Sequence, residues 1–140
     1  MRNSNLLILC LLISGLIAGP LGCSTVGSPG CRPSEEKAIA DSLYFGSARP
    51  SGTVSPEEWQ AFVVKEVTPR FPQGLTSWQA SGQWLSASGV LQRERSFVLY
   101  LVHPDTPQAE RGIREIIERY RNEFQQESVL RVRSLVCVSF

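Results

Sequence analysis

The chain has 140 residues, four cysteines and one histidine, and its 14 basic and 13 acidic residues leave a net charge of +1. A near-neutral chain is a poor candidate for nucleic-acid binding, because such binding depends on neutralising phosphates with an excess of positive charge. A single histidine excludes a zinc site of the Cys/His type, and the sequence contains no standard catalytic motif and no Gly-rich phosphate loop. We therefore predict no metal and no cofactor.

Residues 1–22 are predicted to be an export signal. Leu6–Ala18 is an apolar run that is too short to span a bilayer as a mature helix. The run leads to Cys23 in a setting that resembles the lipobox of bacterial lipoproteins, although Pro20 and Leu21 depart from the usual pattern. In that family the cysteine is lipidated and becomes the mature N-terminus. The alternatives are an ordinary cleaved signal, which leaves a secreted protein, and an uncleaved anchor.

The predicted location is the cell envelope, with the lipid on Cys23 as the membrane anchor. Ser24 follows this cysteine where an aspartate would resemble an inner-membrane retention signal. In a cell with two membranes we therefore expect the outer membrane, with the protein facing the periplasm. Residues 23–40 begin with a stretch rich in Gly, Ser and Pro and are predicted to form a flexible tether. Residues 41–140 are predicted to be a single domain.

Two further cysteines, Cys31 and Cys137, remain in the exported chain. Export implies an oxidising compartment, in which two remaining cysteines commonly pair. A Cys31–Cys137 disulfide would join the start of the mature chain to its last strand. Two unpaired buried cysteines are one alternative, and a Cys23–Cys31 bridge in a chain without lipid is another.

The first predicted strand is Ser42–Ala48, which places Leu43 and Phe45 on one face. A helix is predicted to begin at Ser55, because Pro56 suits the first helical position and Glu58 completes a capping box. It ends near Thr68, ahead of a proline. The elements that follow are a bend at Arg70–Gly74, a strand at Leu75–Ala80 that Gly82–Trp84 either continues or interrupts with a bulge, a turn at Ser86–Gly89, a strand at Leu91–His103, a helix that starts at Pro104–Pro107 and closes at Gln125–Ser128, and a strand at Val129–Phe140.

This order predicts an α+β fold, a ferredoxin-like βαββαβ two-layer sandwich with an antiparallel sheet and two helices on one face. The strand Leu91–His103 is apolar on both faces, which indicates burial on both. The sheet face without helices therefore needs a cover, because monomers seldom expose large apolar patches. A homodimer through this open sheet face is one possible cover, and the N-terminal tether is the other.

Several short motifs follow one another within the predicted domain: Asp41–Gly46 (DSLYFG), Glu58–Phe62 (EWQAF), Val67–Thr76 (VTPRFPQGLT), Gly82–Trp84 (GQW) and Phe124–Val129 (FQQESV). In this order they resemble a family of exported bacterial proteins, the domain of unknown function number 3574. The resemblance covers Asp41 to about Val132. It implies the domain boundary and the exported setting, and it implies no reaction.

Five polar side chains near the ends of the predicted elements are candidate ligand or catalytic residues, and each has a structural alternative. Arg70 could instead satisfy the carbonyls at the end of the first helix. Gln83 could be a turn amide, and Glu94 could form a salt bridge with a neighbouring arginine. His103 could be a satisfied residue at a strand end, and Tyr44 could belong to the core of an interface.

Two functions are compatible with these features. The favoured one is a membrane-tethered, non-catalytic domain that binds a small molecule or an envelope partner. The alternative is a small cofactor-free enzyme of the dimeric α/β-barrel type, in which His103 is the general base, Glu94 orients it and Arg70 binds an anionic substrate. Ser128 is the one hydroxyl considered as a nucleophile, and its setting does not favour that role.

Overall fold

The computed structural model describes residues 30–85 and 88–140. The predicted export signal and Cys23 lie outside these residues, as do two residues of the predicted turn at Ser86–Gly89. Within the described ranges, no helix is both long enough and apolar enough to cross a bilayer.

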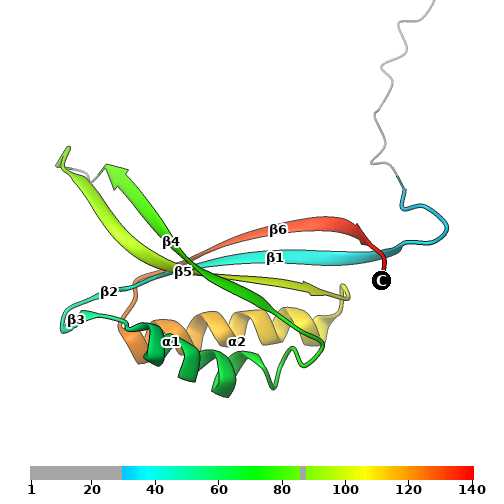
Figure 1. Ribbon diagram of the computed structural model, residues 1–140, viewed down its shortest axis with the longest axis horizontal. Helices are drawn as coiled ribbons and strands as arrows, with labels where there is room; N and C mark the ends of the chain where they lie inside the picture. Colours follow the sequence, from blue (N-terminus) through cyan, green and yellow to red (C-terminus); the bar gives the residue numbers. More distant parts are fainter. Residues whose placement is uncertain (1–29, 86–87) are drawn as a thin grey trace, which may run out of the picture.

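Two helices cover one face of a four-stranded antiparallel sheet, so the predicted α+β class is confirmed (Figure 1). The strands lie in the order β4-β5-β1-β6. Helix α1 connects β1 to β4, and β5 lies between these two strands in the sheet. Helix α2 connects β5 to β6, and β1 lies between those two. The two βαβ units therefore interleave. The elements are β1 (Glu36–Gly46), β2 (Ala48–Arg49), β3 (Gly52–Thr53), α1 (Pro56–Phe62), the π-helical turn η1 (Val63–Val67), β4 (Thr76–Leu85), β5 (Leu91–His103), α2 (Pro107–Phe124) and β6 (Val129–Val138).

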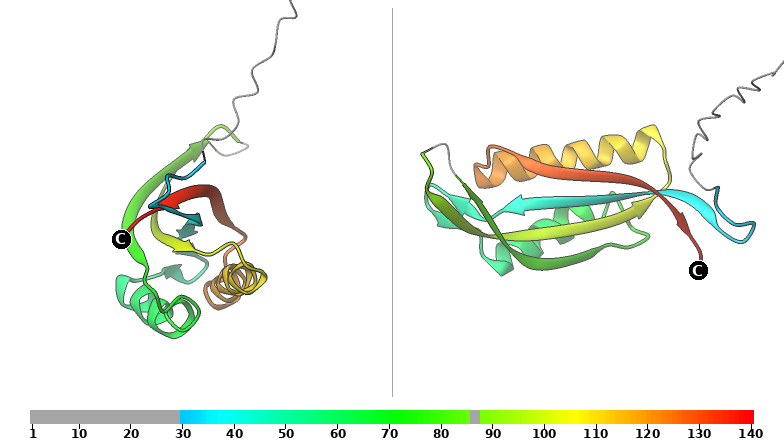
Figure 2. Two further views of the ribbon diagram at one scale, coloured as in Figure 1. Left: turned by 90° about the vertical axis from the view of Figure 1, so that its right-hand side faces the viewer. Right: turned by 90° about the horizontal axis from the view of Figure 1, so that it is seen from above.

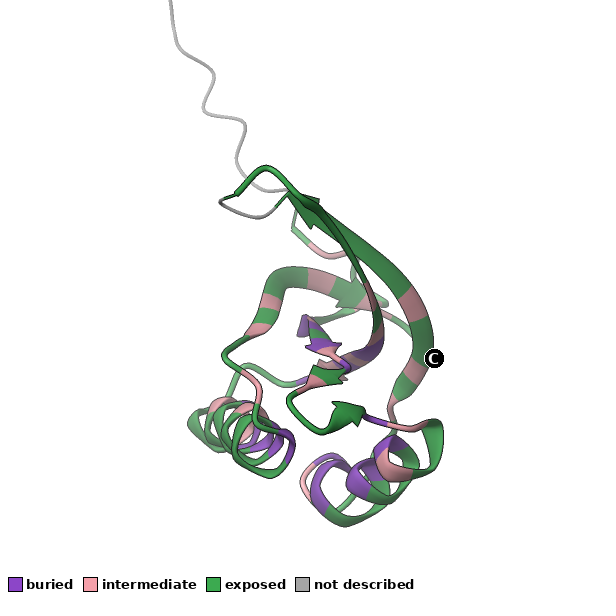
Figure 3. Ribbon diagram, turned by 90° about the vertical axis from the view of Figure 1, so that its left-hand side faces the viewer, coloured by how far each residue is buried: buried purple, intermediate pink, exposed green. Residues whose placement is uncertain are grey.

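An aromatic core fills the space between the sheet and the helices, which lie side by side beneath it (Figure 2). The ring of Phe45 lies 4.6 Å from that of Tyr120, and Trp59 stacks on Phe97 at 5.0 Å. Each such pair adds to the free energy gained by burying the rings. Figure 3 shows that the buried positions gather on the inner sides of the helices and the central strands.

The helix ends follow the sequence closely. Ser55 and Glu58 form the predicted capping box at the start of α1, with reciprocal hydrogen bonds of 3.2 and 2.8 Å. Thr106 lies within the predicted start of α2 and caps this helix by accepting a hydrogen bond of 3.2 Å from Ala109 N. At the other end of α2, Gln125 takes a left-handed conformation with φ of 55°, which stops the helix and turns the chain toward β6.

β1 is longer than predicted, because it begins at Glu36 within the stretch expected to be tether. Ala38, Ile39 and Ala40 are buried there between β5 and β6. The strand was not predicted here because alanines occupy two of these three positions and alanine is not typical of strands. β4 continues unbroken to Leu85, so the bulge considered at Gly82–Trp84 is absent from this described strand.

The predicted disulfide between Cys31 and Cys137 is confirmed. It joins the segment before β1 to the last residues of β6, across a sequence separation of 106 residues. β6 ends at Val138, two residues earlier than predicted, and Phe140 lies outside the sheet and is fully exposed.

Candidate functional site

A trough of about 810 Å³ lies on the open face, which is the face of the sheet opposite the helices. Its walls come from the end of β1, the β2–β3 hairpin, the end of β4, the first half of β5 and the connection from α2 to β6. The residues that line it are Tyr44, Gly46, Ala48, Arg49, Pro50, Gly82, Gln83, Trp84, Glu94, Ser96, Gln125, Gln126, Glu127, Ser128 and Leu130. We refer to this cavity as the open-face trough.

The floor of the trough depends on the absence of a side chain at Gly46. A Cβ atom at this position would stand 2.7 Å from Glu94 Oε1 and 2.8 Å from Gln126 Oε1. With glycine there, Glu94 Oε1 accepts a hydrogen bond of 2.7 Å from Ala48 N, and Gln126 Nε2 donates one of 2.5 Å to Ala48 O. Three segments that are distant in the sequence are thereby joined at one point.

Arg49, which lines the trough, takes part in a partly buried polar arrangement. Arg49 Nη2 donates to both carboxylate oxygens of Glu58, at 2.8 and 3.0 Å, and its guanidinium lies 5.9 Å from the centre of the Phe124 ring. The buried Arg49 Nε has no hydrogen-bond partner among the described residues. The hydroxyl of Tyr120 donates a hydrogen bond of 2.8 Å to Gly46 O. Burial raises the pKa of the Tyr120 phenol far above its ordinary value, and the charge of Glu94 adds to this effect, so the hydroxyl remains a donor.

Large apolar side chains line the trough and are open to solvent. Trp84, Tyr44 and Leu130 are all exposed, although each projects from a paired strand. The half-buried carboxylate of Glu94 and the amide of Gln83 lie beside them. The trough therefore offers flat apolar surfaces next to a few polar groups, which is the usual composition of a small-molecule site.

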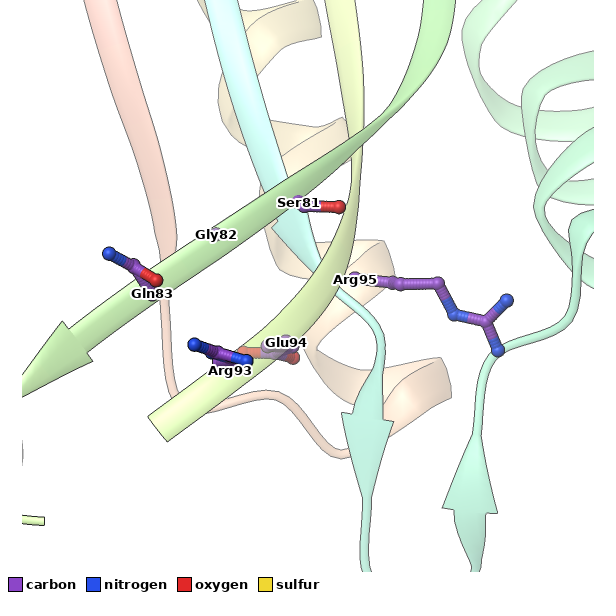
Figure 4. A pocket seen from close by; sticks show the side chains of 6 residues that line it. All are labelled: Ser81, Gly82, Gln83, Arg93, Glu94 and Arg95. Carbon is purple, nitrogen blue, oxygen red and sulfur yellow. The ribbon is translucent and has the colours of Figure 1, made fainter. Parts of the chain in front are cut away.

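A smaller hollow of about 370 Å³ lies beside the trough and shares Gly82, Gln83 and Glu94 with it. Figure 4 shows that the side chain of Arg95 points away from those of Gln83 and Arg93. Because these side chains diverge, the hollow does not bring several polar groups to bear on one ligand. We therefore place the candidate site in the larger trough.

A second group of polar residues, the buried charge cluster, lies on the helix-facing side of the sheet. The carboxylate of Asp41, fully buried in β1, accepts hydrogen bonds from Arg131 Nε (2.7 Å) and Nη2 (2.8 Å). Arg131 also donates to both oxygens of Glu110, at 2.9 and 2.8 Å. His103 Nε2 lies 2.9 Å from Asp41 Oδ2, and His103 Nδ1 lies 2.9 Å from Pro104 O. Both His103 neighbours are acceptors, so a ring nitrogen that carries a proton can donate to the neighbour it faces.

The charges in this cluster stabilise one another. Burial by itself would raise the pKa of Asp41, but hydrogen bonds from Arg131 and His103 outweigh burial and hold that pKa below its ordinary value. Hydrogen bonds from Arg131 also lower the pKa of Glu110. Hydrogen bonds to Asp41 and Glu110 raise the pKa of Arg131. Asp41, Arg131, Glu110 and His103 are thus each bonded within the cluster or to a neighbouring carbonyl, which gives the cluster a structural role.

The five predicted candidates divide between two regions. Tyr44, Gln83 and Glu94 line the trough. His103 is nine residues beyond Glu94 in the same strand, which corresponds to about 30 Å. Arg70 lies on the helix side and donates hydrogen bonds of 2.6 Å to Glu66 O and 3.0 Å to Glu115. It thus has the structural alternative given for it above, the satisfaction of a carbonyl near the end of the first helix. The arrangement with His103 as base, Glu94 as its partner and Arg70 as anion site therefore has no common pocket.

Several residues of both regions were not predicted from the sequence. Asp41 had a usable signal, because it alternates with Leu43 and Phe45 and so points to the core. An acid on a buried strand face needs a cationic partner. Gly46 and Gln126 lie in two of the family-like motifs, but these motifs do not show that the two residues meet, which depends on tertiary proximity.

The geometry defines a small two-layer α+β domain with an open trough on its bare sheet face. The chain belongs to the family described as "Protein of unknown function (DUF3574)", whose profile matches residues 40–140. No curated protein matches the chain. Among solved structures it is similar to a phage SAM lyase in complex with S-methyl-5'-thioadenosine, with 13% identity, a TM-score of 0.55 and coverage of 84% of this chain and 97% of that one.

The phage SAM lyase in its apo state is also similar, with 15% identity, a TM-score of 0.50 and coverage of 81% of this chain and 97% of that one. At these identities the likeness concerns the fold alone.

Proposed function

We propose that the protein is an exported, lipid-anchored domain that binds a small molecule in the open-face trough. The observation that carries this proposal is the gathering of three candidate residues, Tyr44, Gln83 and Glu94, in one cavity of about 810 Å³. Small-molecule sites commonly have volumes of about 300–1,000 Å³. The lipobox-like setting of Cys23 supports the tethered location.

The trough suits a ligand with a flat apolar part and hydrogen-bond donors. Trp84 and Tyr44 offer aromatic faces on which a planar ring can stack. Glu94 uses Oε1 to bind Ala48 N, and a carboxylate has further lone pairs that can accept from a ligand. A purine nucleoside combines a planar ring with donors, and the phage lyase of similar fold was solved with one, S-methyl-5'-thioadenosine. This compound is therefore the first probe.

Calorimetric titration of the purified protein with S-methyl-5'-thioadenosine and adenosine tests the proposal. We expect saturable binding to one site and a loss of about tenfold or more in affinity for Trp84→Ala, since stacking on one aromatic ring contributes about 1–3 kcal/mol. Val64→Ala is the control, because Val64 is 59% exposed against 51% for Trp84, lies in η1 on the helix side and does not line the trough. An equal loss in the two variants, or no binding of either nucleoside, contradicts the proposal.

The variant Glu94→Gln removes the negative charge of this side chain and keeps its size, so it tests whether the charge contributes to ligand affinity. The amide oxygen can still accept from Ala48 N, so the floor of the trough should stay in place. Weaker binding in this variant indicates that the carboxylate charge meets the ligand. Product analysis of the same mixtures addresses the alternative of an enzyme, because conversion of the probe would favour catalysis over binding.

The proposed anchor has its own test. Mass spectrometry of the protein extracted from membranes should find a mature chain that begins at a lipid-modified Cys23. An unmodified Cys23, or a mature chain that begins elsewhere, would contradict the lipid anchor and leave the trough unaffected.

A further inference from the structure

The open face of the sheet is apolar well beyond the trough. The strand registers place on it a central row in which Val98 lies between its cross-strand partners Trp78 and Tyr44. Val98 is only 1% exposed because these larger side chains flank it, whereas Trp78 and Tyr44 are themselves exposed. The other large apolar residues that the registers assign to this face are Trp84, Tyr100, Val102, Leu130, Val132, Val136 and Val138.

Charge is nearly absent from the same face. Among the described strand positions that point to it, only Glu36, at the rim, and Glu94, in the trough, are charged. The opposite face carries the charged residues of β6, Arg131 and Arg133. In the part of the chain that the structure describes, both helices lie on that opposite face (Figure 1). The open face therefore has the composition of a core and no cover among the described elements.

The area of the face is close to what a stable interface between two chains requires. Four strands about 4.8 Å apart, each of about ten residues with a rise of about 3.3 Å, give a flat footprint of about 600 Å². A standard interface buries about 800 Å² on each partner, measured as accessible surface. Accessible surface exceeds the flat footprint, so the open face is large enough to supply one whole interface.

The tether is a poor cover for this face. If the predicted signal is removed, Cys23–Pro29 is the only stretch between the anchor and the described residues. It has the sequence CSTVGSP, in which Val26 is the only sizeable aliphatic side chain. So short and polar a segment cannot bury the aromatic residues of the open face.

We propose that a second copy of this chain packs its own open face against this one. A twofold arrangement places the same patch on both partners, so an apolar, nearly uncharged face is complementary to itself. Facing sheets pack about 10 Å apart with interlocking side chains. The trough opens onto the same face, and the partner therefore covers its mouth and encloses whatever it holds.

The test uses the full-length protein, purified in detergent, with the mass of the protein part measured by light scattering. We expect a mass of two chains at high micromolar concentration. Val132→Glu places a charge on the open face and should give monomers, because a buried unpaired charge is costly. Val64→Glu is the matched control, since Val64 is 59% exposed against 46% for Val132 and lies in η1, on the helix side. It should leave the mass unchanged.

Photo-crosslinking keeps the inference testable if Val132→Glu fails to fold. A photoreactive phenylalanine analogue at position 78 should crosslink to peptides of this chain alone in isolated membranes, whereas the analogue at position 64 should not. A monomeric wild-type protein, or a crosslink from position 78 to lipid or to another protein, overturns the inference. A monomer that still binds the nucleoside probe would overturn the dimer and leave the proposed binding function intact. A dimer that binds neither nucleoside would overturn the binding function and leave the dimer intact.

Discussion

Arg131 reaches along its strand to bind Asp41, which is not the residue directly opposite it. The register of β1 and β6 pairs Asp41 with Arg133 and Leu43 with Arg131. Arg131 nevertheless donates two hydrogen bonds to Asp41, at 2.7 and 2.8 Å, while Arg133 pairs with the exposed Asp105. Two arginines in one strand therefore have very different environments, one in a buried network and one at the surface.

This difference predicts unequal effects of the same substitution. Arg131→Met should lower the free energy of unfolding by about 3–5 kcal/mol, because it leaves a buried carboxylate without its main partner. Arg133→Met should cost less than about 1 kcal/mol, since exposed ion pairs contribute little. Urea denaturation of the two variants measures the difference, and equal losses would show that the cluster does not stabilise the fold.

The lowered pKa of Asp41 predicts a loss of stability in acid. A carboxyl whose pKa is depressed by folding stabilises the native state above its unfolded pKa, and this contribution disappears as the pH falls through the folded value. The ordinary pKa is 3.8, so the free energy of unfolding should decline as the solution is acidified below about pH 4. Urea denaturation at stepped pH measures this decline. Arg131→Met should show a shallower decline than Arg133→Met, and identical slopes would contradict the assignment.

The Cys31–Cys137 disulfide closes a loop with a sequence separation of 106 residues. Chain-entropy arguments give a contribution of about 4–5 kcal/mol for a loop of this length. Reduction of the wild-type protein should therefore lower its melting temperature substantially. The double variant Cys31→Ser and Cys137→Ser should melt at the lower temperature with or without reductant. A wild-type protein that melts at the same temperature in both states would contradict the prediction.

Gly46 and Glu94 should be energetically coupled. Gly46→Ala forces the new Cβ against Glu94 Oε1 and Gln126 Oε1 and should cost about 1–3 kcal/mol, the usual range for overpacking. Glu94→Ala alone removes the hydrogen bond to Ala48 N and should cost about 1 kcal/mol. Because Glu94→Ala removes one of the two groups that the new Cβ meets, the double variant should lose less stability than the sum of the two single losses. Strict additivity would argue against the packing described here.

The sequence was sufficient for features that depend on local pattern. The capping box at Ser55 and the strand Leu91–His103 appear in the structure with the predicted bounds. Alternating apolar residues and capping residues are local properties. They predict the order of strands and helices, and this order predicts the α+β class. The early start of β1 was missed because Ala38–Ala40 becomes a strand through its two neighbours in the sheet.

The candidate site was only partly accessible from sequence. Three of the five predicted candidates, Tyr44, Gln83 and Glu94, line one trough in the fold, and their role in binding stays a prediction. Arg70 and His103 were selected by the same reasoning, but their polar groups are used by Glu66, Glu115 and Asp41. Glu66 is only four residues from Arg70, but Glu115 and Asp41 are 45 and 62 residues from their partners, and such distant pairs cannot be inferred from spacing alone.

The position of the disulfide also bears on how the domain resists mechanical force. β1 begins at Glu36, shortly after Cys31, and pairs with β6 from Glu36 to Phe45 on one side and with β5 from Ile39 to Gly46 on the other. Because antiparallel ladder bonds run perpendicular to the strands, tension applied to the N-terminal end loads many of them in shear at once. The covalent link to Cys137 passes part of that tension directly into β6. The end of the domain that faces the predicted anchor is thus the end best built to withstand pulling.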